Sequence, residues 1–222
     1  MTLTKYAWKQ WLPICLGSAF LVAVSAYFAQ FYALLWIVAG AVTVATLAVL
    51  SFYRSPWRSI PQNLSTGTMI SPADGVVSAV EYVDSHEAVE GKAVIIRIFL
   101  SVLNVHINRA PCECTVEKLI YREGKFLDAR TEESAKVNES NLIILSAGEL
   151  SFGLRQVSGK LAKRIICPLS VGQPLSLGQQ FGMITLGSTT ELILPMDVEP
   201  AINITKGQRV KGGITPLAQV QK

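Results

Sequence analysis

The stretch Gly182-Met183-Ile184-Thr185-Leu186-Gly187-Ser188-Thr189 lies near the C-terminus, and its apolar run resumes in Glu191-Leu192-Ile193-Leu194. Such runs are typical of a buried strand, and a glycine before a hydroxyl residue inside one indicates a bulge or a turn. In a second interpretation the Gly187–Ser188 peptide bond is itself reactive. Glycine lets the backbone bend, and the serine hydroxyl can attack the preceding carbonyl once a base takes its proton. The stretch alone leaves both interpretations open.

The N-terminal quarter of the chain is unusually apolar. Of the 222 residues 50% are hydrophobic and 16% are charged, yet neither a charged residue nor a histidine occurs between Lys9 and Arg54. One membrane span needs about 20 residues, so this run predicts two spans, Leu12 to Ala29 and Phe31 to Leu50, joined by a very tight turn. The alternative is a single span followed by a buried helix. A cleavable signal peptide fits poorly because its apolar region is only about 7–15 residues long.

Basic residues flank this run on both sides and predict its orientation. Lys5 and Lys9 precede it, Arg54 and Arg58 follow it, and the turn between the spans carries no positive charge. By the positive-inside rule both ends face the cytoplasm, so we expect the rest of the chain at the cytoplasmic face of the cell (inner) membrane.

Several other function classes receive no support from the composition. The net charge is +4, and the sequence contains neither a long basic run nor an aromatic-interleaved motif for nucleic acid. We therefore expect no nucleic-acid partner. The four cysteines (Cys15, Cys112, Cys114 and Cys167) form neither a disulfide framework nor two ligand pairs. We expect reduced cysteines and no metal site.

Beyond Pro56 and Pro61 the sequence reads as short β-type runs. The predicted strands are Val76–Val83, Ala93–Leu103, Val105–Ile107, Thr115–Tyr121, Leu142–Leu145, Ser151–Val157, Arg164–Pro168, Phe181–Leu186 and Glu191–Leu194, and Glu132 to Asn141 is predicted to be a loop. Val171–Gly178 and Thr205–Gly212 resemble each other in the way that hairpins of biotinyl/lipoyl-type folds do. The predicted fold class is mainly β, a sandwich or barrel-like domain with lipoyl-like hairpin elements, behind an N-terminal transmembrane α-helical hairpin. We place the membrane-anchoring hairpin in residues 1–55 and the β-rich domain in residues 56–222.

Three side chains are candidates for chemistry. Asp74 lies in Ser71-Pro72-Ala73-Asp74-Gly75, where Asp-Gly is also a common turn pair. The strand period places His106 on one face with Asn104 and Asn108, which indicates either a cleft or a hydrogen-bonded structural histidine. His86, the other histidine, lies in a polar loop and is predicted to be solvated. With Ser188, Asp74 and His106 supply the components of a proton-relay nucleophile.

Several segments, in order, carry a resemblance to a known family. Phe52-Tyr53-Arg54-Ser55-Pro56 is similar to its Phe-Phe-Arg-Asp-Pro motif, with Ser55 departing from the usual Asp. The others are Ser71–Gly75, Asn104–Pro111, Tyr121–Phe126, Asn138-Glu139 and Leu186-Gly187-Ser188-Thr189. The chain thereby resembles the phosphatidylserine decarboxylase proenzymes, in their short pyruvoyl-dependent class. Arg109 stands where the longer class has a second histidine, and Leu-Gly-Ser-Thr replaces the frequent Phe-Gly-Ser-Arg.

The resemblance implies a proenzyme that cleaves itself between Gly187 and Ser188. Ser188 Oγ would attack the Gly187 carbonyl, with His106 as base and Asp74 orienting the imidazole. A β chain (residues 1–187) and an α chain (residues 188–222) would stay associated, and Ser188 would become the pyruvoyl cofactor. That group would form a Schiff base with phosphatidylserine and release phosphatidylethanolamine.

The implied partners are the substrate phosphatidylserine and membrane lipids, and Arg97, Arg109 and Arg164 are candidates to contact the lipid phosphate. Two alternatives remain open at this point. One is a decarboxylase of a related serine phospholipid, and the other is a non-catalytic, membrane-tethered β-domain scaffold, which would stay intact at Gly187–Ser188. The sequence also leaves open a homo-oligomer.

Overall fold

A computed structural model describes residues 1–160, 164–185 and 187–220 of the chain. It divides into two compact units, Met1–Trp57 and Arg58–Lys222, which are described separately.

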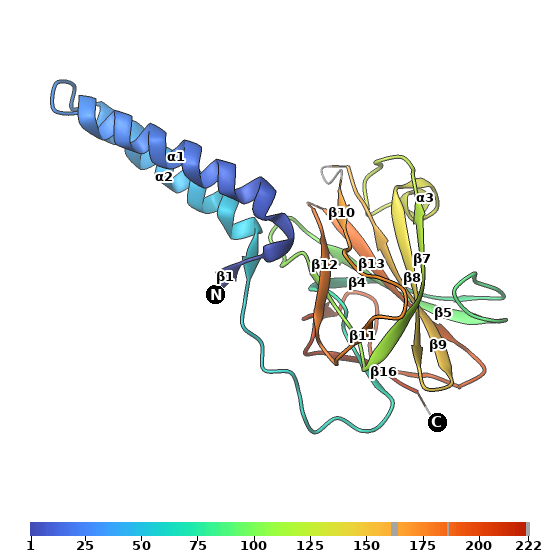
Figure 1. Cartoon of the computed structure of the whole chain (residues 1–222). Coiled ribbons are helices and arrows are strands. Elements are labelled where there is room, and N and C mark those ends of the chain that lie inside the picture. The colour runs from blue at the N-terminus through green and yellow to red at the C-terminus, as the bar shows by residue number, and fades with distance from the viewer. Residues whose placement is uncertain (161–163, 186, 221–222) are drawn as a thin grey trace. The chain divides into compact units, whose positions relative to one another are not determined.

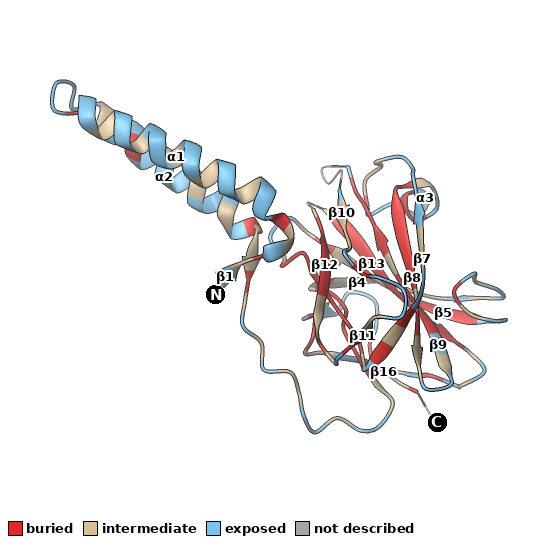
Figure 2. Cartoon of the chain, in the orientation of Figure 1, coloured by how far each residue is buried: buried red, intermediate tan, exposed pale blue. Residues whose placement is uncertain are grey.

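The first unit is a helical hairpin. A short 3-10 helix (η1, Lys5–Ala7) leads into α1 (Trp8–Phe28), and α2 (Leu35–Phe52) returns beside it (Figure 1). Both helical segments are long and apolar enough to cross a membrane, and much of their length is exposed (Figure 2). Large apolar side chains such as Phe20 and Ile37 are each 68% exposed. Helices that are apolar all round and exposed suit a lipid environment. Strands β1 (Thr2–Leu3) and β2 (Arg54–Ser55) pair antiparallel and join the two ends of the hairpin.

The predicted helical hairpin is therefore confirmed, with one difference at its turn. The second helix begins at Leu35 and not at Phe31, because the backbone N–H groups of Phe31 and Tyr32 both donate to the Phe28 carbonyl. These bonds close the turn, so the second helix begins four residues later than predicted.

The second unit is mainly β, as predicted. Its largest sheet is antiparallel and has eight strands in the order β11-β7-β8-β9-β13-β5-β4-β15. The bounds are β4 Gly75–Val83, β5 Ala93–Leu100, β7 Cys114–Arg122, β8 Ser140–Ala147, β9 Leu150–Val157, β11 Pro174–Leu175, β13 Ser188–Pro195 and β15 Arg209–Val210. Two three-stranded sheets complete the unit, with the orders β10-β12-β6 and β14-β16-β3. Their strands are β3 Thr68–Ile70, β6 Ile107–Arg109, β10 Ile165–Ile166, β12 Gln180–Ile184, β14 Ala201–Ile202 and β16 Pro216–Gln219.

Strand β13 lies at the centre of the large sheet and is buried along its whole length (Figures 1 and 2). It pairs with β5 on one side and with β9 on the other. Leu192 and Leu194 belong to the main apolar core, whereas Ile193 belongs to a smaller cluster. Since strand residues alternate between faces, Ser188 and Thr190 share the face of the main core, and Thr189 and Glu191 share the other.

The sequence misplaced several element ends. The predicted loop Glu132 to Asn141 contains a short helix, α3 (Glu132–Val137), whose first turn is capped by the Thr131 side chain accepting from Ser134 N. The strand predicted to reach Leu103 ends at Leu100, and the next begins at Ile107 rather than Val105. Leu186, the predicted end of another strand, lies outside the described residues, and β12 ends at Ile184.

Three turns share one design, which explains the similarity between Val171–Gly178 and Thr205–Gly212. The turns are Ser170–Gln173, Ser176–Gln179 and Thr205–Gln208. In each, the glutamine N–H donates to the carbonyl of the first residue, and its side-chain oxygen accepts the N–H of that residue. The third residue is always a glycine with positive φ (81°, 70° and 91°), which a side chain would strain.

Candidate functional site

Ser188 is the first residue of β13 and lies directly opposite Leu100 of β5. The residue is fully buried, and its hydroxyl oxygen has no hydrogen-bond partner among the described residues. Leaving a buried hydroxyl unpaired costs about 1–3 kcal/mol, so native structures rarely keep one without a reason. This unpaired hydroxyl is the feature that singles out Ser188 as a reactive group.

Both backbone polar groups of the preceding residue, Gly187, have close neighbours in the fold. Its φ is +68°, in the left-handed region that favours glycine. Its N–H donates to Nε2 of His106 at 3.3 Å. Its carbonyl oxygen lies against Gly159, where a Cβ would stand only 1.7 Å from that oxygen. The carbonyl that Ser188 would attack therefore has a fixed position in the fold.

His106 is fully buried immediately before β6, and its backbone carbonyl accepts a hydrogen bond from Ile184 N. Its Nδ1 lies 2.9 Å from the carbonyl oxygen of Asn104. A carbonyl can only accept, so this contact assigns the proton to Nδ1. Nε2 then carries the lone pair and accepts the Gly187 N–H, which places a base at the Gly187–Ser188 bond. The structure thus brings together two of the three candidate residues, His106 and Ser188.

Asp74 has different partners from the imidazole that the sequence suggested. Its Oδ2 forms an ion pair with Arg58 at 2.6 Å, and its Oδ1 accepts the Gly212 N–H at 2.8 Å. Arg58 also donates to the Gly212 carbonyl, so three distant segments meet at Asp74. The orientation of His106 by Asp74 stays a prediction.

Asn138, directly after α3, connects the loop before this helix to the end of β9. Asn138 donates to the carbonyl oxygens of Leu127 and Ser158, and its own Oδ1 accepts the Leu127 N–H. Ser158 N in turn donates to the Glu139 carbonyl at 2.9 Å. These bonds fix Ser158 and therefore the adjacent Gly159, which contacts the Gly187 oxygen. The sequence identified Asn138-Glu139 as a motif without a role, and it missed Gly159, because neither contact leaves a periodic pattern.

Three buried amide side chains are linked by hydrogen bonds to Thr190, which shares the main-core face of β13 with Ser188. Asn108 donates to Thr190 Oγ1 at 2.9 Å and accepts from Gln156 Nε2 at 2.8 Å, and Gln156 Oε1 accepts from Asn141 at 3.1 Å. Asn108 and His106 are both fully buried. Asn104 differs, since its side chain lies in a turn with Ser101.

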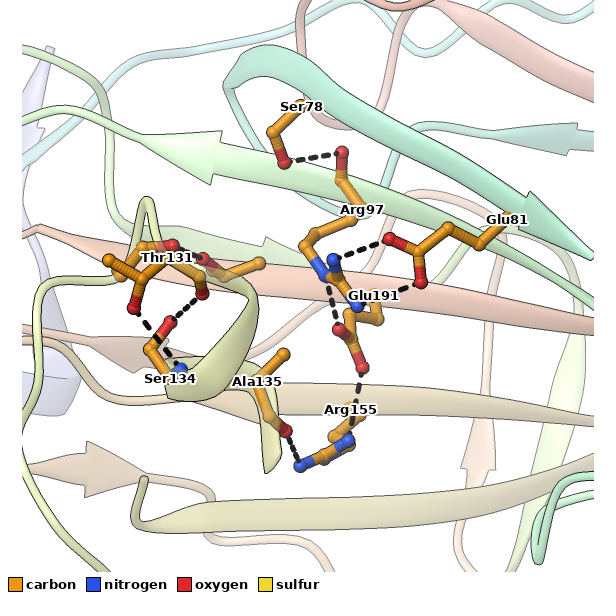
Figure 3. A network of polar contacts seen from close by, with 10 residues as sticks. Ser78, Glu81, Arg97, Thr131, Ser134, Ala135, Arg155 and Glu191 are labelled. Atoms are coloured by element: carbon orange, nitrogen blue, oxygen red, sulfur yellow. Dashed lines mark hydrogen bonds and ion pairs between the residues drawn. The ribbon is translucent and has the colours of Figure 1, made fainter. Parts of the chain in front are cut away.

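The opposite face of β13 carries a buried ionic network, shown in Figure 3. Glu191, whose side chain is 1% exposed, accepts from Arg97 Nε at 2.7 Å and lies 3.4 Å from Arg155 Nη1. Arg97 also pairs with Glu81, and Arg155 donates to the Ala135 carbonyl of α3 (Figure 3). Coulombic attraction to Glu191 and the hydrogen bond with it raise the pKa of Arg97, although burial opposes the rise. This network connects β13 to its neighbours and to α3.

His86 is half-buried rather than solvated as predicted. Its Nδ1 accepts the Ala88 N–H at 3.1 Å, and burial lowers the pKa of its imidazole.

The three arginines proposed for phosphate binding differ in their exposure to solvent. Arg97 is occupied by Glu191 and Glu81, and the buried Arg109 donates to the Gly178 carbonyl at 2.9 Å. Arg164 is exposed, and its backbone carbonyl accepts the Thr185 N–H, two residues before Gly187. Arg164 is therefore the candidate best placed for an incoming anionic group.

The site suits a group made from the chain itself. Ser188 supplies a buried, unpaired oxygen on a fixed strand, and His106 lies beside it. In the part of the chain that the structure describes, no group of three His, Cys, Asp or Glu side chains is arranged to hold a metal ion.

Comparisons with known proteins agree on one family. The family model described as phosphatidylserine decarboxylase matches residues 45–218. The chain is 43% identical over 175 residues to a phosphatidylserine decarboxylase proenzyme of Carboxydothermus hydrogenoformans. The matched region covers 79% of this chain and 81% of that protein. Proenzymes with the same name are 40% identical in the Wolbachia symbiont of Brugia malayi (80% and 77% covered) and 38% identical in Desulfotalea psychrophila (80% and 81% covered).

Proposed function

Since this chain belongs to the phosphatidylserine decarboxylase family, we propose that it is a proenzyme that cleaves itself between Gly187 and Ser188 and decarboxylates phosphatidylserine to phosphatidylethanolamine. The observation that carries this proposal is the buried, unpaired hydroxyl of Ser188 beside a carbonyl fixed by Gly159 and an amide bound to His106.

In the maturation step, Ser188 Oγ attacks the Gly187 carbonyl carbon while His106 Nε2 takes the hydroxyl proton. The peptide C–N bond breaks, the proton moves to the Ser188 nitrogen, and Gly187 is left as an ester on Oγ. Loss of the Ser188 Cα proton then expels the Gly187 carboxylate. The dehydroalanine left at position 188 adds water and loses ammonia, which yields the pyruvoyl group. Nε2 of His106 accepts the Gly187 N–H in the uncleaved chain. It must exchange this partner for the Ser188 hydroxyl before it can take the hydroxyl proton.

In the decarboxylation step, a pyruvoyl group formed at position 188 would supply the electron sink, through a Schiff base with the substrate amine, for the electrons left by carbon dioxide. His106 lies beside position 188 and returns a proton to the substrate carbon. Arg164 presents a positive charge at the margin of the site for the lipid phosphate.

We further propose that the hairpin anchors the enzyme in the inner membrane with the β unit on the cytoplasmic side. The basic flanks support this orientation, and the two apolar helices support the anchor. A periplasmically active reporter fused after Lys222 should stay inactive, and a strong signal would contradict this orientation.

The test of the main proposal is the intact mass of the purified protein under denaturing conditions. Wild-type protein should give two chains divided between Gly187 and Ser188, the second with a pyruvoyl N-terminus, and Ser188→Ala should give one intact chain. An intact wild-type chain that still decarboxylates phosphatidylserine would refute the pyruvoyl mechanism. An intact chain without activity would favour the scaffold alternative. A decarboxylase of a related serine lipid would cleave itself but prefer that lipid over phosphatidylserine in competition.

A further inference from the structure

The turn Ser101–Asn104 presents aliphatic side chains to solvent at the edge of the candidate site. Val102 is 44% exposed and Leu103 is 80% exposed. The turn is well ordered by hydrogen bonds, because Asn104 Oδ1 accepts both Ser101 N at 2.9 Å and Ser101 Oγ at 2.7 Å. The turn therefore presents two adjacent aliphatic side chains, Val102 and Leu103, from a fixed backbone.

This turn is connected to the reacting atoms at both of its ends. Leu100, which precedes it, pairs with Ser188, and Asn104, which ends it, holds Nδ1 of His106 through its carbonyl. Leu103 therefore lies close in the fold to residue 188 and His106.

Two exposed basic residues belong to the same edge. Lys160 follows Gly159, which touches the Gly187 carbonyl, and Arg164 binds Thr185 through its backbone. Exposed aliphatic and basic side chains together match a bilayer surface with anionic lipids, which takes apolar groups into its acyl boundary and attracts cations to its head groups.

We propose that the Ser101–Asn104 turn inserts Val102 and Leu103 into the lipid bilayer and so holds the site against the surface that contains its substrate. This inference rests on the proposed function, since it concerns how a lipid held in the bilayer reaches residue 188. It is distinct from the anchoring by the helical hairpin, because it acts at the site itself.

The fold contains a matched control for this turn. Ser170–Gln173 has the same two hydrogen bonds, since Gln173 N donates to the Ser170 carbonyl and Gln173 Oε1 accepts Ser170 N at 3.2 Å, and Val171 in this turn is 65% exposed. This turn lies at the other end of the large sheet. Its Gly172 N donates to the Val116 carbonyl, near the start of β7. The end of β7 nearest the site is Arg122, which is aligned through Ser140 and Val157 with Thr189. Leu103→Asp and Val171→Asp therefore place one charge on equivalent turns, near the site and far from it.

The experiment uses the full chain in phosphatidylcholine vesicles, with phosphatidylserine either embedded in them or supplied as a dihexanoyl form below its micelle concentration. Leu103→Asp should mature normally, lose about tenfold in activity on the embedded lipid, and keep its activity on the soluble form. Val171→Asp should match the wild type on both. Equal activity of the two variants on the embedded lipid would overturn the proposal, and so would an equal loss by Leu103→Asp on both substrates. A wild type that is inactive on both would contradict the proposed function instead.

A second measurement decides the matter if Leu103→Asp does not mature. Leu103→Trp in vesicles with brominated acyl chains should lose more fluorescence than the wild type, whose four tryptophans all lie before Arg58. Val171→Trp should gain only unquenched emission. Equal quenching at both positions would overturn the proposal.

Discussion

The Cα of Gly159 lies against the carbonyl oxygen of Gly187, so closely that an added methyl group would stand 1.7 Å from that oxygen. No side chain can occupy position 159 without displacing the carbonyl that Ser188 must attack. This contact joins the end of β9 to the start of β13 at the proposed cleavage site.

We therefore expect Gly159→Ala to slow self-cleavage strongly, because it displaces the reacting carbonyl from its position. The rate is measured on gels after cell-free synthesis. Gly153→Ala, in the middle of β9, is the matched control, since its Cβ would meet the Ala88 side chain and not the site. Gly153→Ala should lower stability but cleave, and cleavage of Gly159→Ala at the wild-type rate would contradict the role of the contact.

His106→Ala should slow cleavage by about 10²-fold or more, since a neutral serine hydroxyl is a poor nucleophile without a base. His86→Ala is the control and should mature normally, because His86 accepts the Ala88 N–H and lies in the connection between β4 and β5. Normal processing of His106→Ala would leave the base of this step unidentified. Arg109 cannot replace it, because a guanidinium stays protonated.

Asp74→Asn and Arg58→Met separate two roles for Asp74. Each breaks a largely buried ion pair and should lower the free energy of unfolding by about 3 kcal/mol, measured by denaturant titration in the non-cleaving Ser188→Ala background. Asp74→Asn should also slow self-cleavage in the serine-containing chain, and more than Arg58→Met does, if Asp74 orients His106. Equal rates would restrict Asp74 to holding Arg58 and Gly212 together.

Glu191→Leu should destabilise the β unit by about 3–5 kcal/mol, because it leaves Arg97 and Arg155 without their buried counter-charge. Chemical denaturation in the Ser188→Ala background measures this effect. Glu87→Leu removes an exposed partner of Arg122 and serves as the control, with an expected loss of about 1 kcal/mol or less. Similar losses for the two variants would show that the buried network contributes little.

Stability should fall in acid partly through His86. Burial lowers its pKa in the folded state, so between that value and the unfolded value of about 6.5 the unfolded chain binds more protons. Stability from this group is complete above pH 6.5 and is lost as the pH falls through the folded pKa. His86→Gln should flatten the acid side of a plot of melting temperature against pH. An unchanged slope would assign the loss to other groups, since Glu87 and Arg122 also face His86.

Local pattern and composition were sufficient to predict the helical hairpin and the mainly β class. The uncharged run up to Arg54 suffices for the hairpin, because a membrane span is set by length and hydropathy. Alternation and turn residues were enough for the mainly β class. The family resemblance directed attention to Ser188 and His106, which the structure places beside the same peptide bond.

What the sequence could not supply are contacts between distant segments. The ion pair of Arg58 with Asp74 and the approach of Gly159 to Gly187 join residues whose spacing has no period. The helix α3 was missed because its single turn depends on a cap from Thr131 more than on hydrophobic periodicity. His86 appeared solvated because its neighbours in sequence are polar, whereas its surroundings come from the folded sheet.

The position of Ser188 at the start of a central strand has a consequence for the life of the cleaved protein. All four cysteines precede Ser188, so no disulfide can join the two chains after the cut. The later chain is retained by the ladders of β13 with β5 and β9, of β15 with β4 and of β16 with β3. Folding before the cut is a first-order event within one molecule, but reassembly after full denaturation requires two molecules to meet. The proposed maturation would therefore turn a refoldable polypeptide into one whose recovery depends on concentration.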